Sequence, residues 1–524
     1  MKLNLIIILI CYSVDGCFGQ YTYFNNVYEG NLTGVLHSQV REISGEYHSI
    51  GLEDFGISLR NYSLDGNLIS IVNSEPDIGD VGIGSNSRDN LLYLNEGYIS
   101  SNGFGFNSCA YFTRYAGIAH FTSNLDTLWT RTFPEWSVCD SLTIETYSFC
   151  PIDENTSAML SSMIYMNGHP APVDSFAMRI TSFNNQDGTL LNDYFTTLPF
   201  TTFSMRQLRY LNGFYYVLGT VLFEPTNPLD YQTLLLKVNE NAEIVDQLEV
   251  GNPNGGWEKW PQMEVSQDQK IILNYELTTD YDQPELNVHV QHSESRIALI
   301  DPTTLTIEED VNVPLPYLEN WIGGISKRCI LQDGQQNILL IDGVTLFGGE
   351  PAQVDSMELH LNIITKLSPE LEVIWQHEYY SPDFGDPYYF DTNLIDMIQT
   401  SDNGYLFGGV SYSDCCQKHW LLKLDYCGYE EPMGCPAVVD GVEQNKTEEE
   451  ILLWPNPCNN ILNARLPNSV REVRLIDQTG RIVMQEKVYF PNQQWNVSKL
   501  PAGVYLLEAI DENGLAITKR VIKG

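Results

Sequence analysis

Short runs of alternating apolar and polar residues, separated by polar turns, make up most of the chain. One arrangement, an alternating run, a turn and a second run, recurs seven times. Alternation with a period of two indicates strands with one buried face, and helical spacing is almost absent. The seven copies span residues 56–75, 118–133, 176–195, 233–250, 296–313, 361–380 and 419–428.

The copies are evenly spaced along the chain. The apolar residue before each turn serves as an anchor, and successive anchors lie 57 to 67 residues apart. A second hairpin precedes several copies, as at Asn212-Gly213, where glycine supplies the positive φ of a tight turn. Tandem four-stranded units predict an all-β, seven-bladed β-propeller over residues 20–428, whereas the alternative, an open β-solenoid, normally has shorter repeats. The anchors are Tyr62, Phe121, Ile180, Val238, Ile300, Leu367 and Leu424.

The seventh copy stops at Gly428 and lacks its second strand. Residues 21–28, near the N-terminus, resemble the missing strand. We therefore expect residues 21–28 to pair antiparallel with the strand around residues 420–424. This pairing would close the ring and cover an edge that otherwise promotes aggregation.

The N-terminal residues have the pattern of an export signal. Lys2, an apolar run over residues 5–12 and a small-residue zone predict a signal peptide at residues 1–19. The alternative is lipidation at Cys17, although the acidic Asp15 fits that pattern poorly. No later segment reaches the roughly 20 apolar residues of a membrane span, so the sequence predicts no transmembrane segment.

Composition restricts the partners. The chain has 28 Lys and Arg against 68 Asp and Glu, a formal charge of −40. A protein this acidic is a poor candidate for binding nucleic acid or an anionic membrane, because both interactions need a basic surface. Without Cys11 and Cys17, nine of the 11 cysteines remain, so at least one thiol lacks an internal partner. Cys139 with Cys150, and Cys427 with Cys435, are close enough in sequence to staple a loop.

The last part of the chain has a different character. Residues 429–450 form a polar, acidic linker, and residues 451–524 show short alternating runs typical of a small β-sandwich. This tail carries 9 Lys and Arg against 6 Asp and Glu, so its charge is +3 and that of everything before it is −43.

Four motifs in the tail carry a resemblance to a known family. They are LWPNPCNNIL from residue 453, LIDQTGRIV from residue 475, LPAGVYLL from residue 500 and TKRVIK from residue 518. In this order they resemble the type A C-terminal sorting domain of the Bacteroidetes type IX secretion system. The residues matching its landmarks are Pro455, Asn456, Pro457, Gly480, Arg481, Gly503, Tyr505, Lys519 and Lys523.

This resemblance implies a destination. In that family the signal peptide directs export across the inner membrane, and the tail directs passage through the outer membrane of a Gram-negative bacterium by engaging the secretion machinery. The cargo is then released or attached to surface lipopolysaccharide. The preceding propeller units are also similar to propellers common in such cargo, a group without a single activity.

Candidate chemistry is sparse. The sequence has no GxSxG, HExxH or phosphate-binding glycine loop, so we assign no catalytic, cofactor-binding or metal residues. His289 and His292 lie in an alternating run that predicts a strand, where this spacing places them on opposite faces. The acidic clusters 280–282 and 383–386 leave calcium as the one ion to consider, but no DxDxDG loop is present.

Two classes of function remain. The first is a secreted or surface-bound, non-catalytic module that binds a glycan or a protein through the propeller loops. The second is an extracellular hydrolase of polysaccharide that uses carboxylates in the central channel, where like-charge crowding raises the pKa of one of them. We favour the first, because no nucleophile and base can be paired from sequence spacing.

Overall fold

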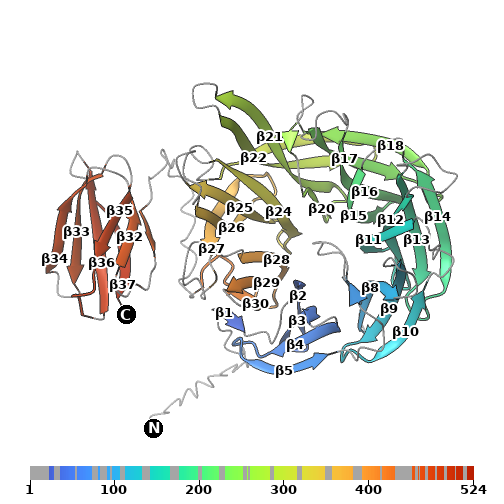
Figure 1. The fold of residues 1–524 in the computed structure, drawn as a ribbon, viewed down its shortest axis with the longest axis horizontal. Coiled ribbons are helices and arrows are strands. Elements are labelled where there is room, and N and C mark those ends of the chain that lie inside the picture. Colours follow the sequence, from blue (N-terminus) through green and yellow to red (C-terminus); the bar gives the residue numbers. More distant parts are fainter. Residues whose placement is uncertain are drawn as a thin grey trace, which may run out of the picture. The chain divides into compact units, whose positions relative to one another are not determined.

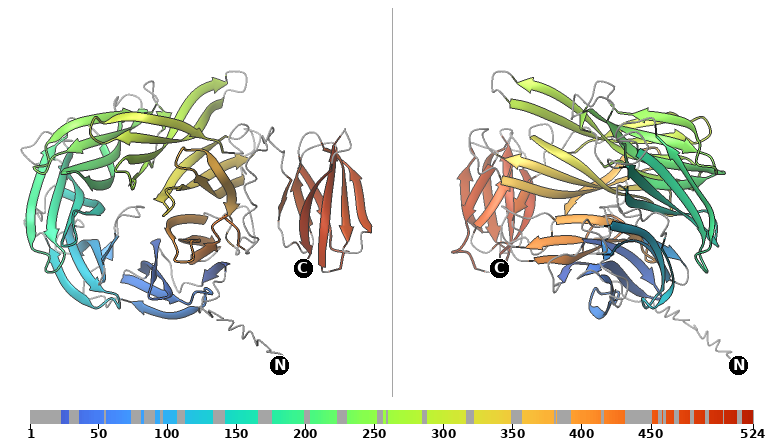
Figure 2. Two further views of the ribbon diagram at one scale, coloured as in Figure 1. Left: turned by 180° about the vertical axis from the view of Figure 1, so that it is seen from behind. Right: turned by 45° about the vertical axis from the view of Figure 1, so that its right-hand side comes forward.

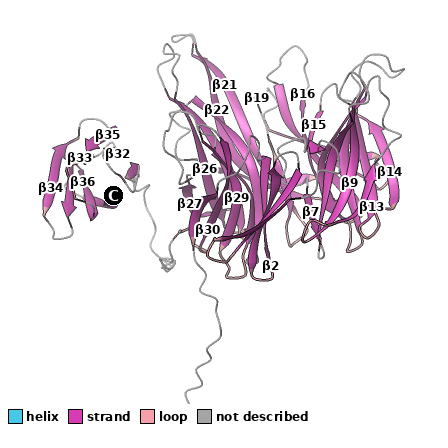
Figure 3. Ribbon diagram, turned by 60° about the horizontal axis from the view of Figure 1, so that its bottom comes forward, coloured by secondary structure: helices cyan, strands magenta, loops and turns pink. Residues whose placement is uncertain are grey.

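The computed structural model consists of strands and their connections. The residues that it describes contain no helix, and therefore no helix long and apolar enough to cross a membrane (Figure 3). The described residues are 23–28, 36–53, 56–73, 81–82, 91–94, 97–106, 113–132, 142–165, 176–198, 203–222, 230–251, 256–257, 260–283, 288–315, 322–348, 357–379, 381, 392–413, 416–430, 451–454, 458, 461–466, 470–477, 481–488, 492–501, 503–511 and 516–523. The predicted signal peptide, most of the predicted linker and the acidic cluster 383–386 therefore lie outside them.

Contacts divide the chain into two compact units, Met1–Cys435 and Pro436–Gly524. The described strands of the first unit form seven mainly antiparallel sheets arranged as a ring, which is a seven-bladed β-propeller (Figures 1 and 2). The fold predicted from the repeats is thus confirmed. The domain limits drawn from sequence at residues 20–428 and 451–524 stay predictions.

The first four blades follow the chain, with the innermost strand first. Blade 1 contains β2 (Leu36–Ile43), β3 (Glu46–Glu53), β4 (Gly56–Tyr62) and β5 (Leu68–Asn73). Blade 2 contains β6 (Val81–Gly82), β7 (Leu91–Leu94), β8 (Gly97–Phe106), β9 (Thr113–Thr122) and β10 (Thr127–Thr132). Blade 3 contains β11 (Leu142–Pro151), β12 (Thr156–Tyr165), β13 (Phe176–Asn184) and β14 (Leu190–Thr197). Blade 4 contains β15 (Phe203–Leu211), β16 (Phe214–Leu222), β17 (Asp230–Val238), β18 (Ile244–Val250) and the short β19 (Gly256–Trp257).

The last three blades complete the ring. Blade 5 contains β20 (Gln262–Val265), β21 (Ile271–Gln283), β22 (Val288–Asp301) and β23 (Thr306–Val313). Blade 6 contains β24 (Ile322–Gln332), β25 (Ile338–Gly348), β26 (Met357–Leu367) and β27 (Val373–Tyr379). Blade 7 contains β28 (Thr392–Gln399), β29 (Tyr405–Ser413), β30 (Cys416–Leu424) and, as its outermost strand, β1 (Phe24–Tyr28) from the N-terminus.

Strand β1 closes the ring as the sequence predicts. It runs antiparallel to β30, with Phe24 opposite Lys423 and Tyr28 opposite His419 (Figure 1). The indole nitrogen of Trp420 donates a hydrogen bond of 2.7 Å to Asn25 Oδ1. Blade 7 therefore has four strands because the two ends of the propeller sequence share one sheet.

The hydrophobic core lies between the blades. Each pair of neighbouring blades encloses its own cluster of buried side chains, including the pair formed by blades 7 and 1. In that last cluster, Phe24 and Leu421 of blade 7 pack with Val40 and Tyr47 of blade 1. A blade alone would leave these faces exposed to water, so the ring is the smallest arrangement that buries all of them.

The repeated turn between the third and fourth strands explains the regular spacing of the copies. A Ser, Thr, Asn or Asp opens each turn, and its side-chain oxygen accepts backbone N–H groups two or four residues later. These residues are Ser63, Thr122, Asn184, Asn239, Asp301, Ser368 and Asp425. A buried residue with positive φ follows within each turn, namely Gly66, Leu125, Gly188, Ala242, Leu305, Leu371 or Gly428.

The third anchor needs a correction. By its position before the turn, the equivalent of Tyr62 and Phe121 is Phe183, not Ile180. The intervening Thr181 and Ser182 are polar but buried within β13, and Thr181 Oγ1 donates to Asp193 Oδ1 at 3.0 Å. Because these polar residues lie inside the strand, the sequence pattern placed the start of the turn at Thr181, three residues before its actual start at Asn184.

The cysteine predictions have mixed outcomes. Cys150 is a buried thiol, so the suggested Cys139–Cys150 disulfide is wrong. Cys329 and Cys458 are buried thiols as well. Cys427 is disulfide-bonded, but Cys435 lies outside the described residues, so this pairing stays a prediction. His289 and His292 both lie on β22, as predicted.

The second unit is a small β-sandwich. One sheet has the order β31 (Leu452–Trp454), β32 (Ile461–Arg465) and β35 (Asn492–Asn496). The other has the order β34 (Ile482–Lys487), β33 (Val470–Asp477), β36 (Gly503–Asp511) and β37 (Ala516–Lys523). Between the sheets, Leu462, Leu475, Trp495, Leu507 and other apolar side chains form the core, as the predicted sandwich requires.

Candidate functional site

The described tail landmarks gather at one end of the sandwich. Gly503 lies opposite Lys523 in the sheet, and Tyr505 lies opposite Asp477, which precedes the turn to Arg481. Cys458 forms a parallel bridge with Lys523. Pro455, Asn456, Pro457 and Gly480 lie outside the described residues, but the described neighbours of all four motifs meet here. Lys519, the remaining landmark, lies opposite Leu507 on β37.

Two landmark side chains have clear structural roles. The Tyr505 ring is buried, and its hydroxyl donates a hydrogen bond of 2.8 Å to the carbonyl of Pro501. Arg481 donates through its backbone N–H and its Nε to Asp477, at 3.1 Å in each case. Because the carboxylate holds both groups, this pair closes the hairpin that joins β33 to β34.

Gly503 lies within a strand and not at a tight turn. It is the first residue of β36, and its φ lies outside the left-handed region. A Cβ atom at this position would meet only Tyr505 Cε2, at 4.0 Å, which is ordinary contact. The described structure therefore gives no steric reason for glycine at 503.

On the propeller, neighbouring blades are linked through the turns that follow their innermost strands. Gln332 Oε1 accepts the N–H of Gln267 in the preceding blade at 2.7 Å, and Gln399 Oε1 accepts that of Gly334 at 2.7 Å. Glu42 Oε2 likewise accepts the N–H of Ser401 at 2.7 Å. The joint between blades 7 and 1 thus repeats the clamp found inside the continuous chain.

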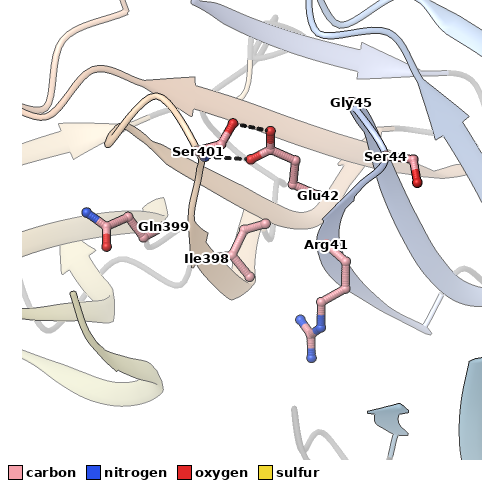
Figure 4. A pocket seen from close by; sticks show the side chains of 7 residues that line it. All are labelled: Arg41, Glu42, Ser44, Gly45, Ile398, Gln399 and Ser401. Atoms are coloured by element: carbon pink, nitrogen blue, oxygen red, sulfur yellow. Dashed lines mark hydrogen bonds between the residues drawn. The ribbon is translucent and has the colours of Figure 1, made fainter. Parts of the chain in front are cut away.

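A depression of about 540 Å³ opens beside this last clamp (Figure 4). We call it the seam depression, because it lies where β28 of blade 7 meets β2 and the β2–β3 turn of blade 1. Its walls carry a guanidinium, a carboxylate, an amide and two hydroxyls, with one aliphatic side chain among them. The lining residues are Arg41, Glu42, Ser44, Gly45, Ile398, Gln399 and Ser401.

Buried charge holds the depression in shape. Asp396, which is fully buried, accepts hydrogen bonds from Arg41 Nη1 at 2.9 Å and from the backbone N–H of Val40 at 3.0 Å. A buried carboxylate is stable only when such donors replace water. The Ser44-Gly45 turn above it has φ values of 52° and 82°, which is the geometry of a tight hairpin turn.

The turns between the first and second strands of blades 6 and 7 contain carboxylates with shifted pKa values, but each of these carboxylates forms an ion pair with a lysine. Burial raises the pKa of Asp333, yet hydrogen bonds from Asn337 and Tyr405 outweigh it, and the pKa lies below its ordinary value. Burial likewise raises the pKa of Asp402, and hydrogen bonds from Thr400 and Lys423 bring it below that value. Both are therefore ionised at neutral pH and cannot serve as general acids.

The described residues do not form a metal site. No group of three or more His, Cys, Asp or Glu side chains in the described part of the chain is placed to hold an ion. Asp280 and Asp282 lie on β21, but their side chains and the cluster 383–386 fall outside the description, so the calcium site stays untested.

Comparison with known proteins gives one family and several distant structures. A model described as a secretion system C-terminal sorting domain matches residues 452–524. A search of curated proteins gave no significant match. Among solved structures the chain is similar to the Dos1 propeller, with 8% identity, a TM-score of 0.41 and coverage of 77% of this chain and 94% of that one.

Two further structures cover much of the chain at similarly low identity. An alpha-L-arabinofuranosidase of Fusarium graminearum is 9% identical, with a TM-score of 0.36 and coverage of 77% of this chain and 98% of that one. PorZ, a surface component of the type IX secretion system of Porphyromonas gingivalis, is 10% identical, with a TM-score of 0.17 and coverage of 96% and 99%. We draw no inference about ligand or activity from structures this distant. Residues 452–524 thus match a secretion system C-terminal sorting domain and follow a seven-bladed β-propeller, which is the organisation of a type IX secretion cargo, and such a tail implies export to the cell surface or the extracellular space.

Proposed function

We propose that the exported propeller is a non-catalytic binding module and that the seam depression holds a short glycan. The observation that carries this proposal is the lining of the depression. A guanidinium, a carboxylate, an amide and hydroxyls surround a volume of about 540 Å³. Ligand sites of this size use a few fixed polar groups to orient their ligand, and the hydroxyls of a sugar match these donors and acceptors.

The rigidity of the walls supports the proposal. Arg41 is held by Asp396, and Glu42 is held by Ser401 Oγ at 2.5 Å, so neither side chain must be ordered when a ligand arrives. Preorganised groups of this kind lose little entropy on binding. A protein ligand fits less well, because the buried centre of a protein interface is depleted in charged residues and enriched in aromatic residues. The described lining residues include a guanidinium and a carboxylate and no aromatic side chain.

The alternative, hydrolysis of polysaccharide, needs an acid and a base or nucleophile placed across the scissile bond. Glu42 is the one carboxylate among the described residues that line the seam depression, and Ser401 donates a hydrogen bond to each of its oxygens, so no second carboxylate is placed there to act with it. This arrangement favours binding over turnover.

The export route supplies the setting of the proposal. We assign residues 1–19 as the signal peptide and the nine tail landmarks as the residues that the secretion machinery recognises. The propeller then works outside the outer membrane, either released or attached to surface lipopolysaccharide.

A glycan array probed with the mature full-length chain tests the binding proposal, together with a reducing-sugar assay on the glycans that bind. Ser44→Asp adds a hydrated charge to the wall, and aspartate tolerates positive φ. The matched control is Asn212→Asp, at the equivalent blade 4 turn with φ 53°. We expect Ser44→Asp alone to weaken binding at least tenfold. Equal binding by both variants, or release of reducing sugar, contradicts the proposal.

A further inference from the structure

The outer face of the larger sheet in the sorting domain carries an apolar row. Cross-strand pairing places Ile482 opposite Ile476, Ile476 opposite Leu506, and Leu506 opposite Arg520. Directly opposed residues share a face of a sheet. One row therefore crosses all four strands, from β34 through β33 and β36 to β37, and three of its four members are aliphatic. We call these four residues the outer row.

The outer row is exposed where a polar row is expected. Ile482 is 45% exposed and Leu506 is 41% exposed, and they are the two large apolar side chains of the described sorting domain that stand out to solvent. The outer face of a sheet that packs on one side normally carries polar residues. Leu475 and Leu507, the chain neighbours of Ile476 and Leu506, already supply the inward face, so the outer row is not needed for the core.

The next row on the same face follows the usual rule. It consists of Gln485, Arg474, Glu508 and Thr518. Arg474 forms ion pairs with Glu508 at 3.4 Å and with Glu472 at 2.8 Å. The apolar character of the outer row therefore does not extend to this neighbouring row.

The outer row lies beside the landmark residues. Ile482 directly follows Arg481, and Leu506 directly follows Tyr505. The outer row therefore lies at the end of the sandwich where the described landmarks meet, next to the exposed Arg481. Arg481 and Arg520 add positive charge to it, and the Arg481 side chain is 77% exposed.

We propose that the outer row is a docking surface for a component of the secretion machinery, one that presents an apolar ridge with carboxylates beside it. The proposal rests on the sorting role of the tail and adds to it a contact outside the sequence landmarks. Exposed apolar residues grouped with polar neighbours mark protein interaction sites. The charge of the tail, +3 against −43 for the rest of the chain, favours an acidic partner.

The test compares two substitutions on β34 of the full-length chain, expressed in the bacterium that exports it. Ile482→Lys places a charge in the outer row, and Gln485→Lys places the same charge in the polar row. Fractionation and immunoblotting measure how much protein leaves the periplasm. We expect Ile482→Lys to lower export at least fivefold, while Gln485→Lys and the conservative Ile482→Val export like the wild type.

Controls separate docking from folding and from sorting itself. Thermal melting of each purified chain shows whether the sandwich is folded. If Ile482→Lys unfolds it, Leu506→Thr repeats the test, because threonine is favoured in strands. Normal export of a folded outer-row variant overturns the proposal. A change in propeller stability with unchanged export points instead to docking on the chain's own propeller and also overturns it. A chain that lacks residues 451–524 serves as a further control. If this chain is exported as well, the sorting role of the tail is contradicted, and not only the docking role of the outer row.

Discussion

Glu42 accepts two hydrogen bonds from Ser401, 359 residues later in the chain. The backbone N–H of Ser401 lies 2.7 Å from Glu42 Oε2, and its hydroxyl lies 2.5 Å from Oε1 (Figure 4). Together with strand β1, this pair fastens the last blade to the first. The seam depression lies beside this contact, so the proposed ligand site and the closure of the ring depend on the same residues.

Removing this clamp is expected to weaken the ring. Glu42→Ala removes the acceptor of two solvent-exposed hydrogen bonds from Ser401, and a typical hydrogen bond contributes about 0.5 to 1.5 kcal/mol net. Urea unfolding of the propeller measures the change. Ser401→Ala, which removes only the hydroxyl, should cost less. Equal stability of Glu42→Ala and the wild type would show that β1 and the other contacts between blades 7 and 1 hold the ring closed without this clamp.

Deleting residues 21–28 is expected to open the ring. The strand β30 would lose its antiparallel partner, and the apolar cluster that contains Phe24 and Leu421 would be exposed. An unpaired strand edge beside apolar surface promotes association between molecules. Light scattering of the purified protein should therefore show oligomers. A monomer with the thermal stability of the wild type would contradict this prediction.

Two glycines with similar backbone geometry are expected to respond differently to alanine. Gly45 and Gly66 have φ values of 82° and 75°, so either substitution strains the backbone by about 1 to 2 kcal/mol. A Cβ at Gly66 would also lie 2.8 Å from the Phe24 ring, whereas nothing lies within 4 Å of one at Gly45. Gly66→Ala should therefore cost distinctly more in urea unfolding.

The reason for that difference can be checked directly. Shortening the ring by Phe24→Leu should recover part of the stability lost in Gly66→Ala, because it makes room for the added methyl group. The same second substitution should not help Gly45→Ala. Equal losses in the two single variants would mean that backbone strain, and not contact with β1, dominates at Gly66.

Acid is expected to destabilise the closing sheet through His419. Burial, with the nearby Arg60 as a second cause, lowers the pKa of His419 to about 3. The folded protein keeps the ring neutral, while the unfolded chain binds a proton below pH 6.5, so stability is complete above pH 6.5 and falls as the pH drops toward 3. The slope from this group is about 1.4 kcal/mol per pH unit.

A substitution that removes the titrating ring isolates this effect. His419→Leu should lose stability less steeply between pH 6.5 and 4 than the wild type, as measured by urea unfolding at a series of pH values. At pH 8 the His419 ring is neutral in both the folded and the unfolded state, so the difference in unfolding free energy between the two proteins at this pH serves as the reference. Parallel pH profiles would show that other groups cause the acid sensitivity.

Local sequence determined the repeat and therefore the blade. Each turn is built by a residue such as Ser63 or Asn239 that binds its own backbone a few positions later, and each strand shows its buried face by alternation. Such signals act within about ten residues and survive in the sequence. The sequence also predicts the closing strand, because the seventh copy lacks its second strand and the N-terminal segment resembles that strand.

Where burial overrode polarity, the sequence misled. Thr181 and Ser182 looked like the start of a turn, yet strand pairing and a hydrogen bond to Asp193 bury Thr181 in β13. Cys150 looked available for a disulfide, but it packs among apolar residues between blades 3 and 4. In both cases the residue is buried by contacts with another strand or blade, and the residues next to it in the sequence do not indicate those contacts.

Tertiary structure alone decided the sites. The tail motifs around residues 454, 480, 503 and 523 were recognised one by one, but their meeting at one end follows from the order and register of strands distant in sequence. The outer row and the Glu42–Ser401 clamp arise in the same way. Hydrogen bonds within a turn depend on neighbouring residues, whereas contacts across strands and blades depend on how the whole chain is registered, and only the folded ring and sandwich determine that register.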